Sequence, residues 1–184
     1  MLIEIAPPLF DVYLDIRYAT ADNLTGAPLY RRPLCLLRPE AAEPLLRAVA
    51  LARGLGYRLR LFDGFRPVEA QWSLWRALPD PTYIADPMIG SCHSRGAALD
   101  VTLDGIDGHP LEMGTGFDDM TPYSHHGRID LDPEAQRNRA LLLGIMTAAG
   151  WTHYPFEWWH YQLPNPGRYP LLSDSAAGGR MRWK

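Results

Sequence analysis

The stretch EAAEPLLRAVALARGLGYRLRLFDG, residues 40–64, carries the pattern that decides the fold. Its first part places apolar residues at helical spacing and stops at glycines, which predicts an amphipathic helix over residues 40–53 with Pro44 in its first turn. Its second part alternates apolar residues with arginines from Tyr57 to Phe62, which predicts a strand ending in an Asp-Gly turn. Helical and strand segments therefore follow one another directly.

The other elements are predicted from the same kinds of pattern. Helices are expected over residues 67–77 and 133–149, and strands over residues 97–103 and 151–163. This order lacks a regular βαβ alternation, so it favours a single α+β domain over residues 1–184, with helices packed around a central, mostly antiparallel sheet. About residues 172–184, rich in glycine and basic residues, are expected to form a loose C-terminal tail.

Composition excludes several classes of function. A formal net charge of -3 gives no basic field for nucleic acid, so we expect a small-molecule or peptide partner. Cys35 and Cys92 show no CxxC pattern, which argues against a disulfide framework and a cysteine zinc site. The N-terminal residues lack the pattern of a signal peptide and no long apolar run occurs, so a cytoplasmic protein with no membrane partner is expected.

The segment SCHSRGAALD, residues 91–100, combines a histidine in a loop with an aspartate in the strand that follows. Gly96 can adopt backbone angles that other residues avoid, so the loop can fold back and bring His93 toward Asp100. On the strand, the side chain of Asp100 stands on the face opposite the apolar row. These two residues are therefore candidate metal ligands.

The segment EWWH, residues 157–160, supplies a second pair of candidates. Residues three apart point to opposite faces of a regular strand, so we expect a bend at the strand's start that aims Glu157 and His160 into one cavity. Two imidazoles and one carboxylate form a sound Zn²⁺ set, and three protein ligands leave a fourth position for water. Glu157 could then serve as the general base.

Each of these residues also has a more ordinary explanation. A lone buried histidine is usually hydrogen-bonded within the core, an aspartate in a strand is usually an edge charge, and adjacent tryptophans are usually packing. Their joint spacing is what favours a metal centre.

The pattern SxHxxGxAxD followed by ExWWH resembles the D-alanyl-D-alanine dipeptidases, within the larger group of zinc D-Ala-D-Ala carboxypeptidases and dipeptidases. Four further segments match this subgroup, namely residues 18–26 (YATADNLTG), 62–67 (FDGFRP), 113–118 (MGTGFD) and 124–126 (SHH). The resemblance implies a hedgehog/D,D-peptidase-like fold and one Zn²⁺ per chain, held by His93, Asp100 and His160, with Glu157 as the base. The implied reaction is hydrolysis of D-alanyl-D-alanine to two D-alanines by a metal-activated water.

The resemblance also implies roles around the metal. Arg66 is expected near the scissile carbonyl, where a cation stabilises the developing oxyanion. Asp118 is expected to pair with the free amino group of the substrate, and Ser91 to line the substrate pocket. An Asp118 that needs this partner would explain a preference for dipeptides, since a longer chain has no amine there. Asp63 is expected to orient a ligand histidine as an acceptor.

Two other functions are compatible with the same residues. One is a D,D-carboxypeptidase or L,D-endopeptidase acting on peptidoglycan stem peptides, which would need an open cleft. The other is a non-catalytic zinc-binding interaction module, whose expected signature is loss of the base, and Glu157 is present. Oligomeric state, tolerance for other second residues, the metal used in the cell and the choice between nutrient recycling and glycopeptide resistance stay open.

Overall fold

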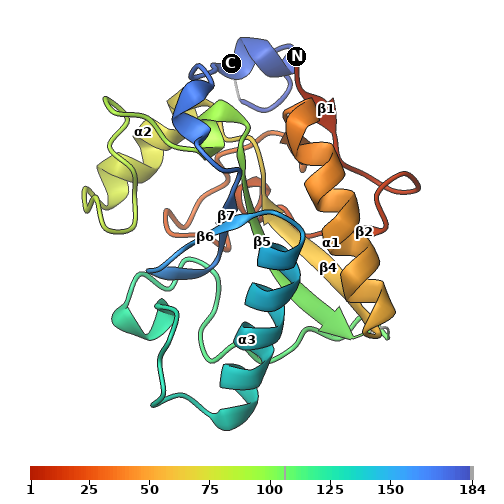
Figure 1. The fold of residues 1–184 in the computed structure, drawn as a ribbon. Coiled ribbons are helices and arrows are strands. Elements are labelled where there is room, and N and C mark those ends of the chain that lie inside the picture. The colour runs from red at the N-terminus through yellow and green to blue at the C-terminus, as the bar shows by residue number, and fades with distance from the viewer. Residues whose placement is uncertain (106, 183–184) are drawn as a thin grey trace.

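A five-stranded sheet in the order β2-β4-β5-β7-β6 forms the centre of the computed structural model, which describes residues 1–105 and 107–182 (Figure 1). The strands are β2 (Val12–Leu14), β4 (Tyr57–Asp63), β5 (Ala98–Gly105), β6 (Thr152–Tyr154) and β7 (Glu157–Gln162). Within this sheet β2 pairs in parallel with β4, and the other neighbours pair antiparallel, so the predicted mostly antiparallel sheet is confirmed. A small antiparallel pair joins β1 (Ile3–Glu4) to β3 (Leu36–Leu37).

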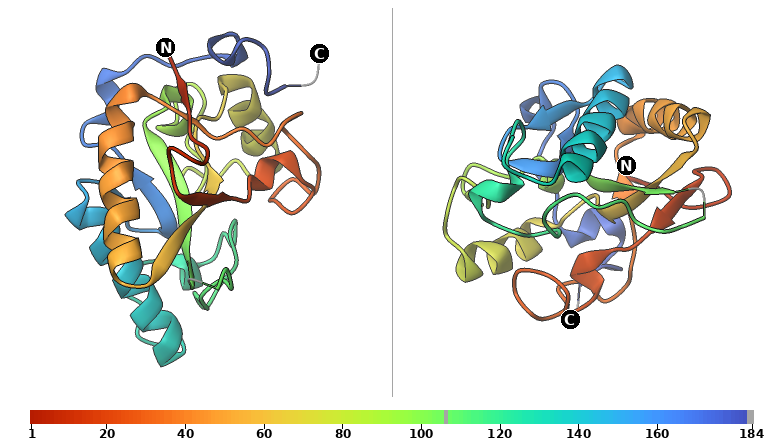
Figure 2. Two further views of the ribbon diagram at one scale, coloured as in Figure 1. Left: turned by 90° about the vertical axis from the view of Figure 1, so that its right-hand side faces the viewer. Right: turned by 90° about the horizontal axis from the view of Figure 1, so that it is seen from below.

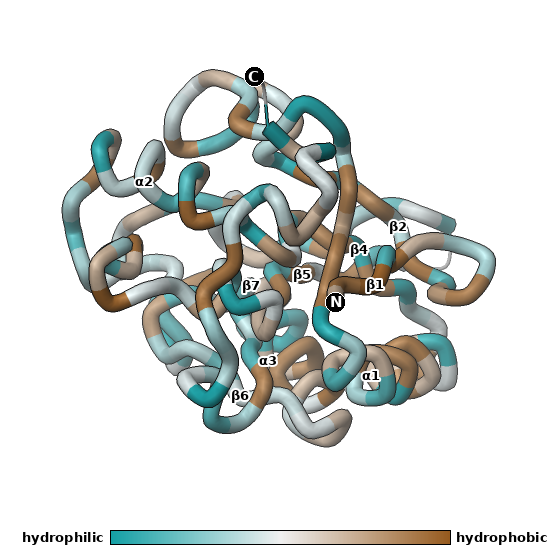
Figure 3. The backbone as a smooth tube through the Cα atoms, turned by 90° about the horizontal axis from the view of Figure 1, so that it is seen from above, coloured by the Kyte–Doolittle hydropathy of each residue, from teal (hydrophilic) through white to brown (hydrophobic). Residues whose placement is uncertain are grey.

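Two of the helices cover one face of the sheet. Figure 2 shows α1 (Ala42–Gly54) and α3 (Pro133–Ala148) together on that face, with α2 (Val68–Ala77) on the opposite side. In Figure 3 both α1 and α3 carry hydrophilic and apolar residues, as expected for helices with one buried face. The arrangement is a single α+β domain, as predicted.

The helix boundaries follow from local chemistry. Pro44 lies in the first turn of α1, where its missing N–H leaves no hydrogen bond unmade. The side chain of Asp132 caps α3 by accepting a hydrogen bond from the Glu134 amide at 2.8 Å. Pro67 is the residue that precedes α2, so this helix begins one residue later than predicted.

The single strand predicted over residues 151–163 is wrong, because the chain turns back between β6 and β7. Thr152 pairs with Gln162 and His153 with Tyr161, but Tyr154 pairs with Glu157, so the pairing shifts within the hairpin. This irregularity breaks the strict alternation of faces along β7. The shift falls between Glu157 and Tyr161, and Glu157 and His160 both line one pocket, as the sequence predicted.

The loose tail predicted for residues 172–184 is corrected for residues 172–182, which pack on the domain. Met181 is fully buried, its carbonyl accepts a hydrogen bond from the Arg31 amide at 2.6 Å, and its amide donates to Asp174. Burial of an apolar side chain explains why this segment is held against the domain. Residues 183–184 lie outside the described residues.

Within the described part of the chain, no helix is both long enough and apolar enough to span a bilayer.

Candidate metal centre and active site

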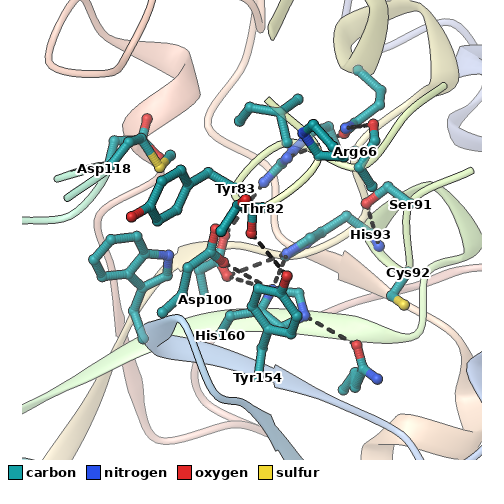
Figure 4. A pocket seen from close by; sticks show the side chains of 18 residues that line it. Arg66, Thr82, Tyr83, Ser91, Cys92, His93, Asp100, Asp118, Tyr154 and His160 are labelled. Atoms are coloured by element: carbon teal, nitrogen blue, oxygen red, sulfur yellow. Dashed lines mark hydrogen bonds and ion pairs between the residues drawn. The ribbon is translucent and has the colours of Figure 1, made fainter. Parts of the chain in front are cut away.

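Three ligand atoms from β5, β7 and the turn before β5 converge in the structure (Figure 4). Asp100 and His160 face each other as register partners on the neighbouring strands β5 and β7. The His93 Nε2 lies 3.0 Å from the His160 Nδ1 and 3.2 Å from the Asp100 Oδ1, and the His160 Nδ1 lies 3.1 Å from the same oxygen. All three side chains are buried. Sheet pairing therefore brings together residues that are far apart in the sequence.

Gly96 makes the turn that presents His93, as predicted. Residues His93–Arg95 form one 3₁₀ turn, and Gly96 follows with φ of +65°, the left-handed region that glycine adopts without strain. A Cβ at Gly96 would lie 2.8 Å from the Cδ2 atom of Leu2 and 3.3 Å from the Arg38 Cγ, so these side chains would also have to shift. The loop can double back here only with glycine.

The protonation pattern of the cluster fits a bound cation. The His93 Nδ1 faces the Gly64 carbonyl oxygen at 2.7 Å, and because a carbonyl only accepts, this nitrogen carries the proton. The His160 Nε2 likewise faces the Gln162 Oε1 at 3.3 Å. With the outer nitrogens protonated, the two inner nitrogens present lone pairs toward each other and toward Asp100, an arrangement that a bound cation would satisfy.

Zinc matches the donor set and its spacing. Imidazole nitrogens and a carboxylate oxygen about 2.0–2.2 Å from a tetrahedral ion would lie roughly 3.3 Å apart, close to the separations in the structure. Burial raises the pKa of Asp100, but the positive charge that His93 and His160 carry when protonated outweighs that effect and holds its pKa well below the usual range, and a bound cation would act in the same direction. Its carboxylate is thus ionised, as a ligand must be.

The backbone carbonyl of Gly64, and not the Asp63 carboxylate, is the group that orients the His93 ring. The Asp63 Oδ2 lies 3.7 Å from the His93 Nδ1, too far for a hydrogen bond, whereas the Gly64 carbonyl is in contact with that nitrogen. Asp63 instead accepts hydrogen bonds from the Arg66 Nε and the Tyr30 hydroxyl, both at 2.9 Å. The guanidinium, which is always charged, attracts this buried carboxylate more strongly than a neutral imidazole does.

Arg66 lies beside the ligand cluster and is itself buried. Its Nη2 is 3.3 Å from the Asp100 Oδ2, and its guanidinium stacks on the Tyr18 ring at 4.6 Å. The side chain therefore brings a fixed positive charge to the wall of the pocket next to the predicted ligands.

Glu157 lies at the start of β7 with its carboxylate next to the cluster. The Glu157 Oε2 is 3.8 Å from the His160 Nδ1, and no side-chain hydrogen bond from the described residues holds the carboxylate. Burial and the negative charge of Asp100 raise the pKa of Glu157 well above its ordinary value, and the Arg66 charge partly opposes them. A buried carboxyl group whose surroundings raise its pKa, next to a candidate metal site, is a candidate for proton transfer.

Asp118 and Ser91 are also placed at the pocket. The Asp118 oxygens accept hydrogen bonds from the Tyr18 hydroxyl and the Leu24 amide, each at 2.9 Å. Burial raises the pKa of Asp118 to about 6, against the effects of the Leu24 amide and the Arg66 charge. The Ser91 Oγ accepts a hydrogen bond from the His93 amide at 3.1 Å.

All the predicted site residues except Asp63 line one pocket. Several neutral residues that the sequence did not single out also line this pocket, namely Gln71, Tyr83, Tyr154 and Gln162. Isolated glutamines and tyrosines carry no spacing signal, so only the three-dimensional arrangement could identify them.

Comparisons with known proteins agree with this geometry. Residues 2–175 match the M15 peptidase family, a metallopeptidase family described as D-Ala-D-Ala dipeptidase. A D-alanyl-D-alanine dipeptidase of Escherichia coli strain K12 is 43% identical over 173 residues, covering 94% of this chain and 90% of the relative. Dipeptidases of Enterococcus faecium and Streptomyces coelicolor are 38% and 37% identical, each covering 84% of this chain and 89% of the relative. The chain therefore belongs to the M15 family of D-Ala-D-Ala dipeptidases.

Proposed function

We propose that this protein is a zinc dipeptidase that hydrolyses free D-alanyl-D-alanine into two D-alanines. The observation that carries the proposal is that the side chains of His93, Asp100 and His160 converge on one point. The Glu157 carboxylate and the buried guanidinium of Arg66 lie next to them. Such a set, at the wall of a pocket, is the equipment that a metallopeptidase needs.

His93, Asp100 and His160 would hold one Zn²⁺ per chain. When bound there, the ion would polarise the scissile carbonyl and lower the pKa of water at its open position. The outer nitrogen contacts with the Gly64 carbonyl and Gln162 fix both imidazole rings in the required tautomer.

Glu157 is the residue we assign to proton transfer. Its carboxylate accepts a proton from the attacking water and delivers it to the nitrogen of the leaving D-alanine. Its position, free of other side-chain hydrogen bonds among the described residues, leaves both oxygens available for this exchange. Arg66 donates to the carbonyl oxygen as negative charge develops there, which typically contributes on the order of 10²- to 10³-fold in rate.

Asp118, together with Ser91, would hold the amino end of the substrate. Asp118 ionises at neutral pH because its pKa of about 6 lies below 7, so it can pair with the substrate ammonium. A longer or blocked peptide would leave this carboxylate without a partner, which favours a dipeptidase over a carboxypeptidase or endopeptidase. Retention of Glu157 argues against a non-catalytic interaction module.

The test is the release of D-alanine by the purified, zinc-loaded protein. We expect the wild type to cleave D-Ala-D-Ala but not its N-acetyl derivative, and Glu157→Ala to be inactive while it still binds zinc. Cleavage of the blocked dipeptide would remove Asp118 as the amine partner. No cleavage by zinc-loaded wild type would instead support the interaction module.

A further inference from the structure

Gln71 is a buried residue of α2 that joins two parts of the pocket. It is 1% exposed, and it lines the same pocket as the predicted metal ligands. Its Oε1 accepts a hydrogen bond from the Arg66 Nη1 at 3.2 Å, and its Nε2 donates to the Ala85 carbonyl at 2.8 Å. Because guanidinium only donates and carbonyl only accepts, the orientation of the amide is fixed.

The first of these contacts completes the set of acceptors around Arg66. Asp63 holds the Nε and Asp100 the Nη2, so Gln71 is the partner of the remaining nitrogen, Nη1. The three acceptors fix both the position and the plane of the guanidinium. Unlike the two carboxylates, Gln71 does so without adding negative charge, so the field of Arg66 at the pocket is preserved.

The second contact fixes the wall of the pocket. Residues 81–85 are consecutive lining residues, and turns around Asp80 organise their N-terminal end. The Tyr154 hydroxyl holds the Thr82 carbonyl at 2.8 Å from the β6–β7 hairpin. The Gln71 amide holds the other end of this wall, at Ala85.

We propose that Gln71 is a positioning residue for the reaction: one amide holds Arg66 toward the scissile carbonyl and the 81–85 wall around the substrate. The inference rests on the proposed dipeptidase function. Among side chains of this length, only the glutamine amide offers an acceptor to the guanidinium and a donor to the carbonyl on one planar group. Glutamate would lose the donor and methionine would lose both.

The two contacts predict separable kinetic effects for Gln71→Met, which conserves size. Loss of the Arg66 contact should lower kcat on the order of 10-fold, because misplacement of a group that acts in the transition state lowers the rate. Loss of the Ala85 contact should raise KM by about 3- to 10-fold, the usual effect of one hydrogen bond. Zinc content should be unchanged, since no predicted ligand is altered.

A double-mutant cycle with Arg66→Met separates this role from a general structural one. In the Arg66→Met background, Gln71→Met should no longer lower kcat, whereas the rise in KM should persist because the wall contact does not pass through Arg66. An equal fall in kcat in both backgrounds, or unchanged kcat and KM in Gln71→Met alone, would overturn the proposal.

Gln136→Met is the matched control. Gln136 occupies the first turn of α3, and its Nε2 also donates to a backbone carbonyl, that of Leu131, at 2.8 Å, but it lies outside the pocket. We expect this variant to keep wild-type kcat and KM.

Amide hydrogen exchange tests the contact between Gln71 and Ala85 without a measurement of enzymatic activity. Gln71→Met should speed amide exchange in residues 81–85, and Gln136→Met should not. Unchanged exchange in Gln71→Met would overturn the proposal even if the dipeptidase assignment itself failed.

Discussion

At the scale of single residues, Asp118 combines a functional requirement with a cost to stability. Its pKa of about 6 lies above the ordinary value, so the native state binds a proton more tightly than the unfolded chain does. The stabilising contribution of the protonated group is therefore present below about pH 4 and lost as the pH rises through 6. Ionisation, which the substrate ammonium requires, opposes stability in the free enzyme.

We expect KM for D-Ala-D-Ala to rise as the pH falls below about 6, because protonated Asp118 cannot pair with the ammonium. Asp118→Asn should raise KM by about 30-fold or more at pH 7.5 and remove this pH dependence. The same variant should have an equal or higher Tm at pH 7.5, since it buries no charge. A KM that follows the wild-type pH profile in the variant would contradict this assignment.

Gln162 has a role that only the geometry of the site suggests, which is to orient His160. Its Oε1 faces the outer nitrogen of His160 at 3.3 Å. Gln162→Leu should weaken zinc binding on the order of 10-fold, because the ring loses the acceptor that fixes its tautomer. Gln162→Glu, which keeps an acceptor, should bind zinc at least as tightly as wild type. Competition with a chromophoric chelator measures both affinities, and an unchanged affinity in Gln162→Leu would refute the role.

The predicted ligands, the base and the arginine were accessible from the sequence because their types and spacing are specific. Gln71 and Gln162 were not, since their roles depend on contacts with Ala85 and His160 that only the fold creates. Asp63 illustrates a related limit: spacing placed it near the site, but the structure pairs it with Arg66.

At the scale of elements, periodicity predicted α1, β4, β5 and α3 with small errors in their ends. The β6–β7 hairpin was not predicted, because its turn at Pro155 and Phe156 lacks the Asn-Gly or Asp-Gly pair that usually marks a hairpin turn. The turn before β5 was predictable, since Gly96 is the residue that allows it.

Gly96→Ala should lower the free energy of unfolding by roughly 2–3 kcal/mol, because the positive φ strains a residue with a Cβ and the Leu2 and Arg38 side chains must also shift. It should also weaken zinc binding by displacing His93. Gly178→Ala is the matched control, with φ of +69° and no atom nearer than 4.0 Å to the added Cβ. We expect it to cost about 1 kcal/mol and to leave zinc affinity unchanged. Urea unfolding of the two variants decides the comparison, and equal losses would contradict it.

At the scale of the whole molecule, the C-terminal segment closes the domain next to the N-terminus. Arg180 pairs with Glu4 at 3.2 Å, which ties the C-terminal segment to the small N-terminal strand β1. The prediction of a loose tail failed because composition alone does not show that a single apolar residue, Met181, is buried.

Met181→Ala should therefore lower the free energy of unfolding by about 2–4 kcal/mol, as expected for a truncated, fully buried side chain. kcat measured well below the unfolding temperature should stay at the wild-type value, because Met181 does not line the pocket. Denaturant unfolding tests the first statement and steady-state kinetics the second. Wild-type stability would mean that the segment does not contribute to the core.

The pairing of Asp100 with His160 across β5 and β7 also has a consequence for biosynthesis. Since one ligand lies in the last strand of the sheet, the ribosome must translate most of the chain before the metal centre can form. A nascent chain stalled ahead of β7 would hold the other two ligands but not the third, nor the base at Glu157. Hydrolysis of D-Ala-D-Ala would thus begin only after β7 has been synthesised, because domains fold and acquire metal as units.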